Sequence, residues 1–304
     1  MPIAFCLIIA TFLWGSSFVS LKFAISSYDP IFVMFFRMIT TFFVCLLLWR
    51  WVKRFRYRVG DWKYLIGMSL AEPCLYFLFE GNALRYTSAS QAGVIISCLP
   101  MLVAILAYFM LKERLSKAIV IGFTLCIVGS VSLTLLSPHS DNAPNPLLGN
   151  LLEFAAMLCA AYYSVSVKYL LTRYSPLSLI AIQGASGTLF FGTLLCFIDF
   201  PQHYDIDALL NIIYLGSVVT LGAYGLYNYA LSKTSILKVA AYSNLTLVFS
   251  LVLSALLLGE VLNIDQWLSV GVVILGILIS QLHNPLPLVP AEENNVQSIT
   301  PLNN

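Results

Sequence analysis

The sequence predicts an all-α integral membrane protein of ten transmembrane helices, arranged as two inverted repeats of five helices. Three observations lead to this fold class: a very apolar composition, ten long apolar stretches, and a repeat between the two halves of the chain. Of the 304 residues, 60% are hydrophobic and only 10% are charged, whereas soluble domains carry about 25% charged residues. Such a chain fits lipid as its solvent.

Ten apolar stretches have the length of a membrane-spanning helix, which needs roughly 20 such residues. Short breaks that contain Pro, Asp, Asn, Lys or Arg separate them. The stretches must be helices, because an isolated strand in lipid would leave its backbone N–H and C=O groups unpaired. The predicted spans are residues 3–25, 30–51, 63–81, 88–111, 117–137, 147–171, 177–198, 208–229, 236–258 and 264–282.

The basic residues orient these spans, because cytoplasmic loops of membrane proteins are enriched in Lys and Arg. With the N-terminus inside, every Lys and Arg except Lys22, Arg37 and Arg85 falls on the inner side. The outer breaks carry aspartates instead: Asp29, Asp141, Asp199, Asp205, Asp207 and Asp265. Ten spans then place both termini in the cytoplasm. Residues 284–304 are rich in Pro, Asn and Glu, so we expect a disordered cytoplasmic tail.

The second half of the chain repeats the first at a nearly constant offset. A shift of 147 residues pairs Ala83, Leu84, Thr87, Ser88 and Gly129 with Ala230, Leu231, Thr234, Ser235 and Gly276. The predicted repeats are residues 3–137 and 147–282, and each holds five spans, so the second copy enters the membrane upside down. Inverted repeats are common in transporters, with the substrate site near the midplane where the halves meet. The sequence therefore predicts a secondary transporter that works by alternating access.

A set of short motifs recurs in both halves in the same order. The first half has Trp14-Gly15, Pro30, Arg37, residues 83–90, Pro100 and Glu113-Arg114-Leu115, and the second has residues 230–235 and 258–262. This set resembles the EamA-type domain of the drug/metabolite transporter superfamily, from residue 3 to about residue 282. Lys112 stands where the family has Gly, and Leu247 where it has Pro.

This resemblance implies ten helices around a central cavity. It also implies proton-linked or facilitated movement of amino acids, related metabolites or drugs. The same resemblance places the chain in the inner (plasma) membrane of a bacterium.

Glu72 is the foremost candidate for chemistry, because a charged side chain within a span is costly and is a functional candidate by default. It lies about nine residues inside its span, roughly 13 Å from the inner end. Steps of four residues put Glu72, Tyr76 and Glu80 on one helix face. We expect Glu72 to bind substrate and to couple transport to protons. The alternative is a buried structural ion pair or a protonated Glu bonded to a neighbouring helix.

Other polar residues within spans complete the predicted site. We expect Arg37 to form a structural charge pair with Glu80 or Asp29. Glu113 and Glu260 are expected to stabilise the fold, Glu153 to reach the outer vestibule, and Lys168 to extend to the inner interface. The predicted substrate-binding residues, suited to a zwitterion or cation, are Trp14, Glu72, Tyr76, Tyr163, Tyr224, Tyr227, Asn228 and Asn244. Singly, each tyrosine is better explained by packing or by the interfacial aromatic belt.

Several function classes are disfavoured by what the sequence lacks. It has no GxxxxGK[ST] motif for ATP, its cysteines and histidines do not cluster, and its net charge of +2 gives no argument for nucleic acid. We expect no metal and no cofactor. The expected partners are a small-molecule substrate, the lipid bilayer and protons, and the expected assembly is a monomer or homodimer.

The expected function is export of small metabolites such as amino acids, and not an enzymatic reaction. The alternative is an integral membrane enzyme that acts on a lipid-linked substrate, which would need paired catalytic groups near one interface. A sensory protein would need an output domain larger than the tail.

Overall fold

A computed structural model describes residues 2–52, 57–111, 117–137 and 143–281. Throughout these ranges the regular elements are helices and there is no strand, which confirms the predicted all-helical class. The elements are α1 (Ile3–Ser27), α2 (Pro30–Leu47), α3 (Trp49–Val52), α4 (Trp62–Ser69), η1 (Leu70–Leu75), α5 (Tyr76–Tyr86), α6 (Ala89–Ile95), η2 (Ile96–Cys98), α7 (Leu99–Leu111), α8 (Lys117–Leu135), α9 (Pro146–Leu170), α10 (Pro176–Leu194), η3 (Leu195–Phe197), α11 (Ile206–Tyr214), η4 (Leu215–Ala223), α12 (Tyr224–Lys233), α13 (Ile236–Tyr242), α14 (Asn244–Leu258) and α15 (Ile264–Gln281). Residues 284–304, predicted to be a disordered tail, lie outside the described ranges.

The polar breaks of the sequence act as helix N-caps. Asp29 accepts a hydrogen bond from the backbone N–H of Ile31, and Pro30 occupies the first position of α2. Asn145 and Ser175 cap α9 and α10 in the same way, each followed by a proline. A side-chain acceptor satisfies an N–H that has no partner inside the helix, and proline at the first position loses no bond.

Eight helical stretches of the described chain are long and apolar enough to cross a membrane. They are Ile3–Ser27, Pro30–Leu47, Ala89–Met110, Lys117–Leu135, Pro146–Leu170, Pro176–Phe197, Ile206–Lys233 and Ile236–Leu258. The predicted spans 63–81 and 264–282 are helical as well, the second as far as the described residues extend, to Gln281. The first, however, is interrupted at Glu72. The second contains an apolar helix of only 17 residues, Ile264–Ser280. The number of ten spans therefore stays a prediction.

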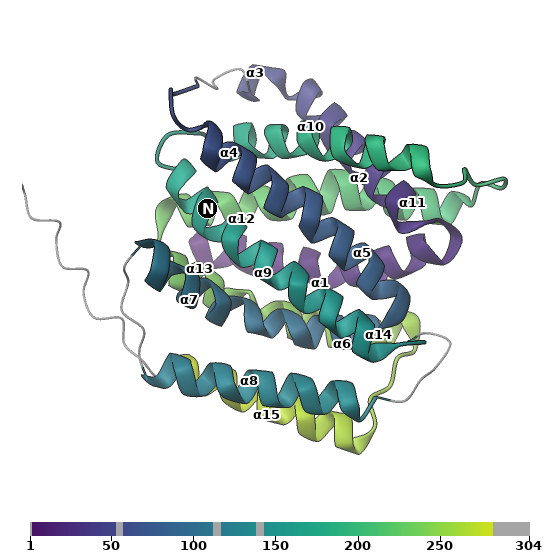
Figure 1. The fold of residues 1–304 in the computed structure, drawn as a ribbon, viewed down its shortest axis with the longest axis vertical. Coiled ribbons are helices and arrows are strands. Elements are labelled where there is room, and N and C mark those ends of the chain that lie inside the picture. Colours follow the sequence, from purple (N-terminus) through teal and green to yellow (C-terminus); the bar gives the residue numbers. More distant parts are fainter. Residues whose placement is uncertain (1, 53–56, 112–116, 138–142, 282–304) are drawn as a thin grey trace, which may run out of the picture.

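The helices lie side by side, with α8 and α15 forming a pair along one edge of the molecule (Figure 1). Helices from the two halves of the chain pack against each other throughout. The most extensive contacts join α1 to α14, α2 to α10, α5 to α9 and α8 to α15. Many large apolar side chains are exposed on the outer surface, including Phe43, Leu135, Leu189 and Leu256. Such a surface suits hydrocarbon and not water.

Glycines bring α8 and α15 into backbone contact. A Cβ atom on Gly122 would lie 2.5 Å from the carbonyl oxygen of Gly276, and one on Gly276 would lie 2.7 Å from the carbonyl oxygen of Gly122. Beside them the Cys126 thiol contacts the carbonyl oxygen of Val273 at 3.5 Å. Small residues at a membrane-helix interface allow this close approach and the van der Waals contact that stabilises it.

Candidate functional site

A small cavity of about 30 Å³ lies between helices of the two halves. This space admits one or two water molecules, so a metabolite requires the wall to open further. Its lining residues are Trp14, Ser17, Phe18, Arg37, Glu72, Tyr76, Glu80, Ile96, Leu99, Met157, Ala160, Tyr163, Ser164, Tyr224 and Tyr227. The wall is thus mainly aromatic and apolar, with three charged side chains at one part of it.

The chain departs from helical geometry at Glu72, where φ is −147° and ψ is 119°. Pro73 follows and has no N–H to donate, so a regular helix could not continue through this point with all its bonds. The carbonyl oxygen of Glu72 instead accepts a hydrogen bond of 3.0 Å from the Gln183 side chain of α10. The Glu72 carboxyl group is buried at the cavity wall, within hydrogen-bond reach of the Tyr224 hydroxyl.

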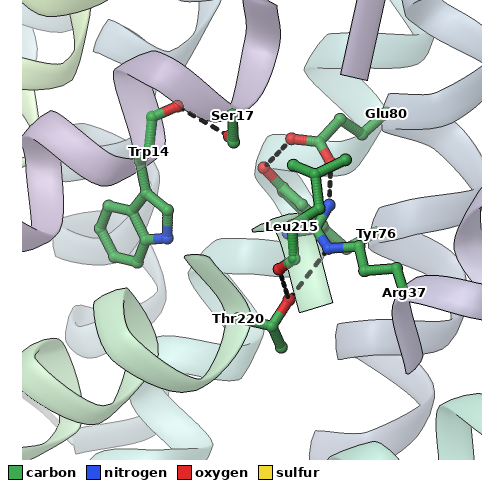
Figure 2. Close-up of polar contacts among 7 residues, drawn as sticks. All are labelled: Trp14, Ser17, Arg37, Tyr76, Glu80, Leu215 and Thr220. Atoms are coloured by element: carbon green, nitrogen blue, oxygen red, sulfur yellow. Dashed lines mark hydrogen bonds and ion pairs between the residues drawn. The ribbon is translucent and has the colours of Figure 1, made fainter. Parts of the chain in front are cut away.

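Arg37 and Glu80 form a buried charge pair at the cavity (Figure 2). The Arg37 Nη1 atom lies 3.5 Å from Glu80 Oε2, and Tyr76 donates a 2.8 Å hydrogen bond to Glu80 Oε1. Arg37 Nε also donates to Thr220 Oγ1 at 2.9 Å, and its guanidinium stacks 3.9 Å from the Phe77 ring centroid. Partners on several sides are what a buried charge requires, since an uncompensated one is very unfavourable.

The second predicted partner of Arg37 is occupied elsewhere. Asp29 lies 3.3 Å from Arg85 in a pair that is largely open to the surface. It also caps α2.

Aromatic rings form another part of the wall. The Trp14 ring centroid lies 5.4 Å from that of Tyr224 and 5.0 Å from that of Tyr227. Tyr163 packs edge-on against Tyr224 at 6.0 Å. The indole N–H of Trp14 is buried and has no acceptor among the described residues. In Figure 2 the indole edge with this nitrogen faces the side on which Arg37 and Glu80 lie.

The structure brings six of the eight predicted substrate-binding residues to the cavity: Trp14, Glu72, Tyr76, Tyr163, Tyr224 and Tyr227. Asn228 and Asn244 are not part of its lining. Asn228 is fully buried and its amide nitrogen donates a 3.0 Å hydrogen bond to the Tyr163 hydroxyl, so it fixes the position of that ring. Asn244 begins α14, and its side-chain oxygen has no partner in the described part of the chain.

Sequence reasoning missed part of the lining, although helical spacing would have found it. Ser17 follows Trp14 by three residues on α1, and Met157 and Ala160 precede Tyr163 on α9 at intervals of three. Residues three or four apart share a helix face. The apolar members of that face carried no chemical signal, so only their position relative to Tyr163 could identify them.

Lys168, predicted to extend to the inner interface, is bonded to the end of another helix. Its Nζ atom donates hydrogen bonds of 2.7 Å to the carbonyl oxygens of Leu231 and Thr234, at the C-terminal end of α12. Lys22 does the same for α5, with bonds of 2.7 and 2.8 Å to Leu84 and Thr87. The last carbonyls of a helix lack intrahelical partners and attract a cation. Each lysine therefore ties its own helix to the end of another.

Glu260 contacts the protein and not the cavity. Its carboxylate accepts hydrogen bonds from the backbone N–H groups of Ala89 (3.0 Å) and Ser90 (2.8 Å), at the start of α6. A negative group is favourable at a helix N-terminus, so this contact holds α14 and α6 together. Glu113, for which the sequence predicts a similar role, lies outside the described residues.

Comparison with known proteins finds transporters. The profile of the EamA-like transporter family matches residues 1–135 and 147–282. The uncharacterized transporter YetK of Bacillus subtilis is 27% identical over 75% of this chain and 69% of its own length. YcxC of the same organism, also named an uncharacterized transporter, is 26% identical over 85% of this chain and 86% of its own length. A WAT1-related chloroplastic protein of Arabidopsis thaliana is 27% identical over 88% of this chain and 66% of its own length.

A solved crystal structure shares the fold. It superposes with a TM-score of 0.68 at 17% sequence identity, over 93% of this chain and 98% of that one. At this identity the match speaks for the arrangement of helices alone.

Proposed function

Because this chain belongs to the EamA-like transporter family, a family of multi-pass membrane proteins, we propose that it is a secondary transporter that exports small zwitterionic or cationic metabolites, such as amino acids. Transport proceeds by alternating access and is coupled to protons. Bacterial relatives named as transporters support the plasma membrane as its location.

The observation that carries this proposal is the composition of the cavity wall. A zwitterion presents an ammonium group and a carboxylate, and the wall offers partners for both. Glu72 and the faces of Trp14 and Tyr227 suit the ammonium group, through charge and cation–π attraction. Arg37 and the unpaired Trp14 N–H suit the carboxylate.

The position of the cavity supports alternating access. Its lining comes from helices of both halves, including α1 and α5 from the first and α9 and α12 from the second. In an inverted-repeat transporter, rocking of one repeat against the other opens such a midplane site to each side in turn. Ten spans in two inverted repeats, over residues 3–137 and 147–282, with both termini in the cytoplasm, are part of this proposal.

Glu72 is the proposed coupling residue. A carboxyl group at the cavity wall can bind either a proton or the ammonium group of the substrate, but it carries only one negative charge. Competition between the two at one site makes the movement of substrate depend on the movement of protons. The interrupted helix at Glu72 favours this role, since it gives the carboxyl group a position that a regular helix would not.

Counterflow in proteoliposomes tests the proposal. Liposomes that contain the full-length protein are loaded with a panel of unlabelled amino acids and related metabolites, then exposed to labelled ones. We expect exchange for at least one zwitterionic or cationic compound and none in protein-free liposomes. Absence of exchange for the whole panel, with folded protein verified in the bilayer, would overturn the proposed function.

A further inference from the structure

Glu153 of α9 is the most deeply buried carboxyl group near the cavity. Its side chain has no exposed surface, and neither carboxylate oxygen has a hydrogen-bond partner among the described residues. Buried charged groups are normally paired or hydrogen-bonded, because isolation in a low-dielectric interior is too unfavourable. A carboxyl group in this position is therefore expected to be neutral, which means that it holds a proton.

The neighbours of Glu153 are themselves titratable. α5 packs against α9, and both Glu80 and Tyr76 of α5 interact electrostatically with Glu153. The oxygens of Glu80 are already engaged, one by Tyr76 and the other by Arg37. Two carboxylates that share one buried region and one guanidinium cannot both ionise without strong repulsion. While Arg37 is bonded to Glu80, the proton thus belongs on Glu153.

Among the described residues, the other elements that pack against α9 form no hydrogen bond with the Glu153 carboxyl group. α6 carries Gln91, which is bonded to Asn150 one turn before Glu153. Tyr64 of α4 packs on Tyr169, far along α9 from Glu153. The remaining titratable side chains on the packed elements are Lys63 on α4, Glu72 and Cys74 on η1, Arg85 and Tyr86 on α5, Cys98 on η2, Tyr108 on α7, Lys117 and Cys126 on α8, Tyr224, Tyr227, Tyr229 and Lys233 on α12, and Lys238 and Tyr242 on α13.

Glu153 is connected to the cavity through residues that line it. Glu80 and Tyr76 are part of the cavity wall, and so is Met157, one turn along α9 from Glu153. A substrate carboxylate that draws Arg37 toward the cavity would weaken the bond between Arg37 and Glu80. The negative charge would then be distributed differently between the Glu80 and Glu153 carboxyl groups, although Glu153 itself touches no substrate.

We infer that Glu153 is a second proton-binding site of this protein, distinct from Glu72. The Arg37–Glu80 pair controls whether Glu153 holds its proton. The role of this proton in transport rests on the proposed function. The proton site itself is a property of the protein alone. Glu72 then exchanges a proton for the ammonium group of the substrate at the cavity wall, and Glu153 carries a further proton one layer behind it.

Infrared difference spectroscopy of the full-length protein in lipid tests the site without any substrate. Spectra taken between neutral and alkaline buffer should show the carbonyl stretch of a protonated carboxyl group in the wild type. The component of this band that belongs to Glu153 should be missing in Glu153→Gln and retained in Glu72→Gln. Gln has nearly the shape of a protonated Glu, so Glu153→Gln should unfold at the wild-type temperature. Asp207→Asn, a change at an exposed acid of α11, is the control and should leave the band unchanged.

Two results would overturn the inference. One is a wild-type spectrum without a protonated-carboxyl band at neutral pH, a result that needs no variant to fold. The other is a band that persists unchanged in Glu153→Gln. Failure of counterflow with a normal Glu153 band would reject the transport proposal and keep the proton site, so the two failures are distinguishable.

Discussion

Glu72 combines two features that are costly in a helix: a buried carboxyl group and an interruption of the backbone. The interruption is stabilised from outside the helix, by the Gln183 side chain. This dependence on another helix makes the Glu72 carboxyl group sensitive to movement of α10 relative to η1. A residue held in this way is suited to change its proton affinity between two states of a transporter.

Glu72→Gln keeps the shape of the side chain but cannot titrate. We expect this variant to fold normally, to lose the dependence of transport on external pH, and to retain exchange without a proton gradient. Uptake is measured against external pH for wild type and variant, normalised to folded protein. A variant with the wild-type pH profile would remove Glu72 from coupling. A loss of expression or thermal stability, with an unchanged profile in the surviving protein, would mark a structural role.

Arg37→Gln removes one partner of a buried pair and leaves the Glu80 carboxylate without its cation. Breaking a buried pair costs about 3–5 kcal/mol of stability, so we expect a clearly lower unfolding temperature. The double variant Arg37→Gln/Glu80→Gln should recover part of this loss, because neither charge is then isolated. Arg85→Gln is the matched control, since the exposed Arg85–Asp29 pair contributes about 1 kcal/mol or less. Equal decreases in unfolding temperature for Arg37→Gln and Arg85→Gln would contradict the assignment of Arg37 and Glu80 as a buried charge pair.

The sequence could not choose between Glu80 and Asp29 as the partner of Arg37, because both belong to the outer half of their segments. What separates them is the arrangement of α2 against α5 and η4, which also supplies Thr220. The contact of Lys168 with α12 was missed for a similar reason. It depends on where the end of α12 lies in space, and no spacing along α9 contains that information.

At the scale of elements, the lengths of the apolar stretches located the helices well but misplaced some helix ends. The predicted span 63–81 stops within α5, which continues to Tyr86. Glu80 and Arg85 made this segment look polar, yet Glu80 is buried because its charge is paired within the protein. The loss of helical geometry at Glu72 was not predicted either. Pro73 alone signalled it, and a proline within a membrane helix is often tolerated.

The α8–α15 pair allows a test of helix packing with an internal control. Gly276→Ala would place a Cβ atom 2.7 Å from the carbonyl oxygen of Gly122, so the helices must separate. We expect a loss of about 1–3 kcal/mol in stability, the usual cost of overpacking. Gly271→Ala, on the same helix with no atom within 4 Å of the new Cβ, should be neutral or slightly stabilising. Thermal unfolding in detergent measures both, and equal stabilities would refute close packing at Gly276.

For the whole molecule, the open question is how the two halves relate to the membrane. The most extensive helix contacts, such as those of α1 with α14 and of α5 with α9, join a helix of the first half to a helix of the second. Neither half is therefore a free-standing unit. The repeat at a shift of 147 residues and the inner excess of Lys and Arg both predict opposite orientations for the two halves. An odd number of spans in each half is the physical requirement for this inversion, and the side on which each terminus lies tests it directly.

Reporter fusions measure that topology. Fusions after Lys53, Lys117 and Arg173 and at the C-terminus should report the cytoplasm, and fusions near His139 and Tyr204 should report the outside. Fusions at Lys53 and Arg173 are the informative pair, because they follow the second span of the first repeat and the first span of the second. Equal cytoplasmic signals at these two sites require an even number of crossing spans between them, as the four predicted spans three to six provide. A C-terminus on the outside would mean an odd number of spans, and the two halves could not be five-helix inverted repeats.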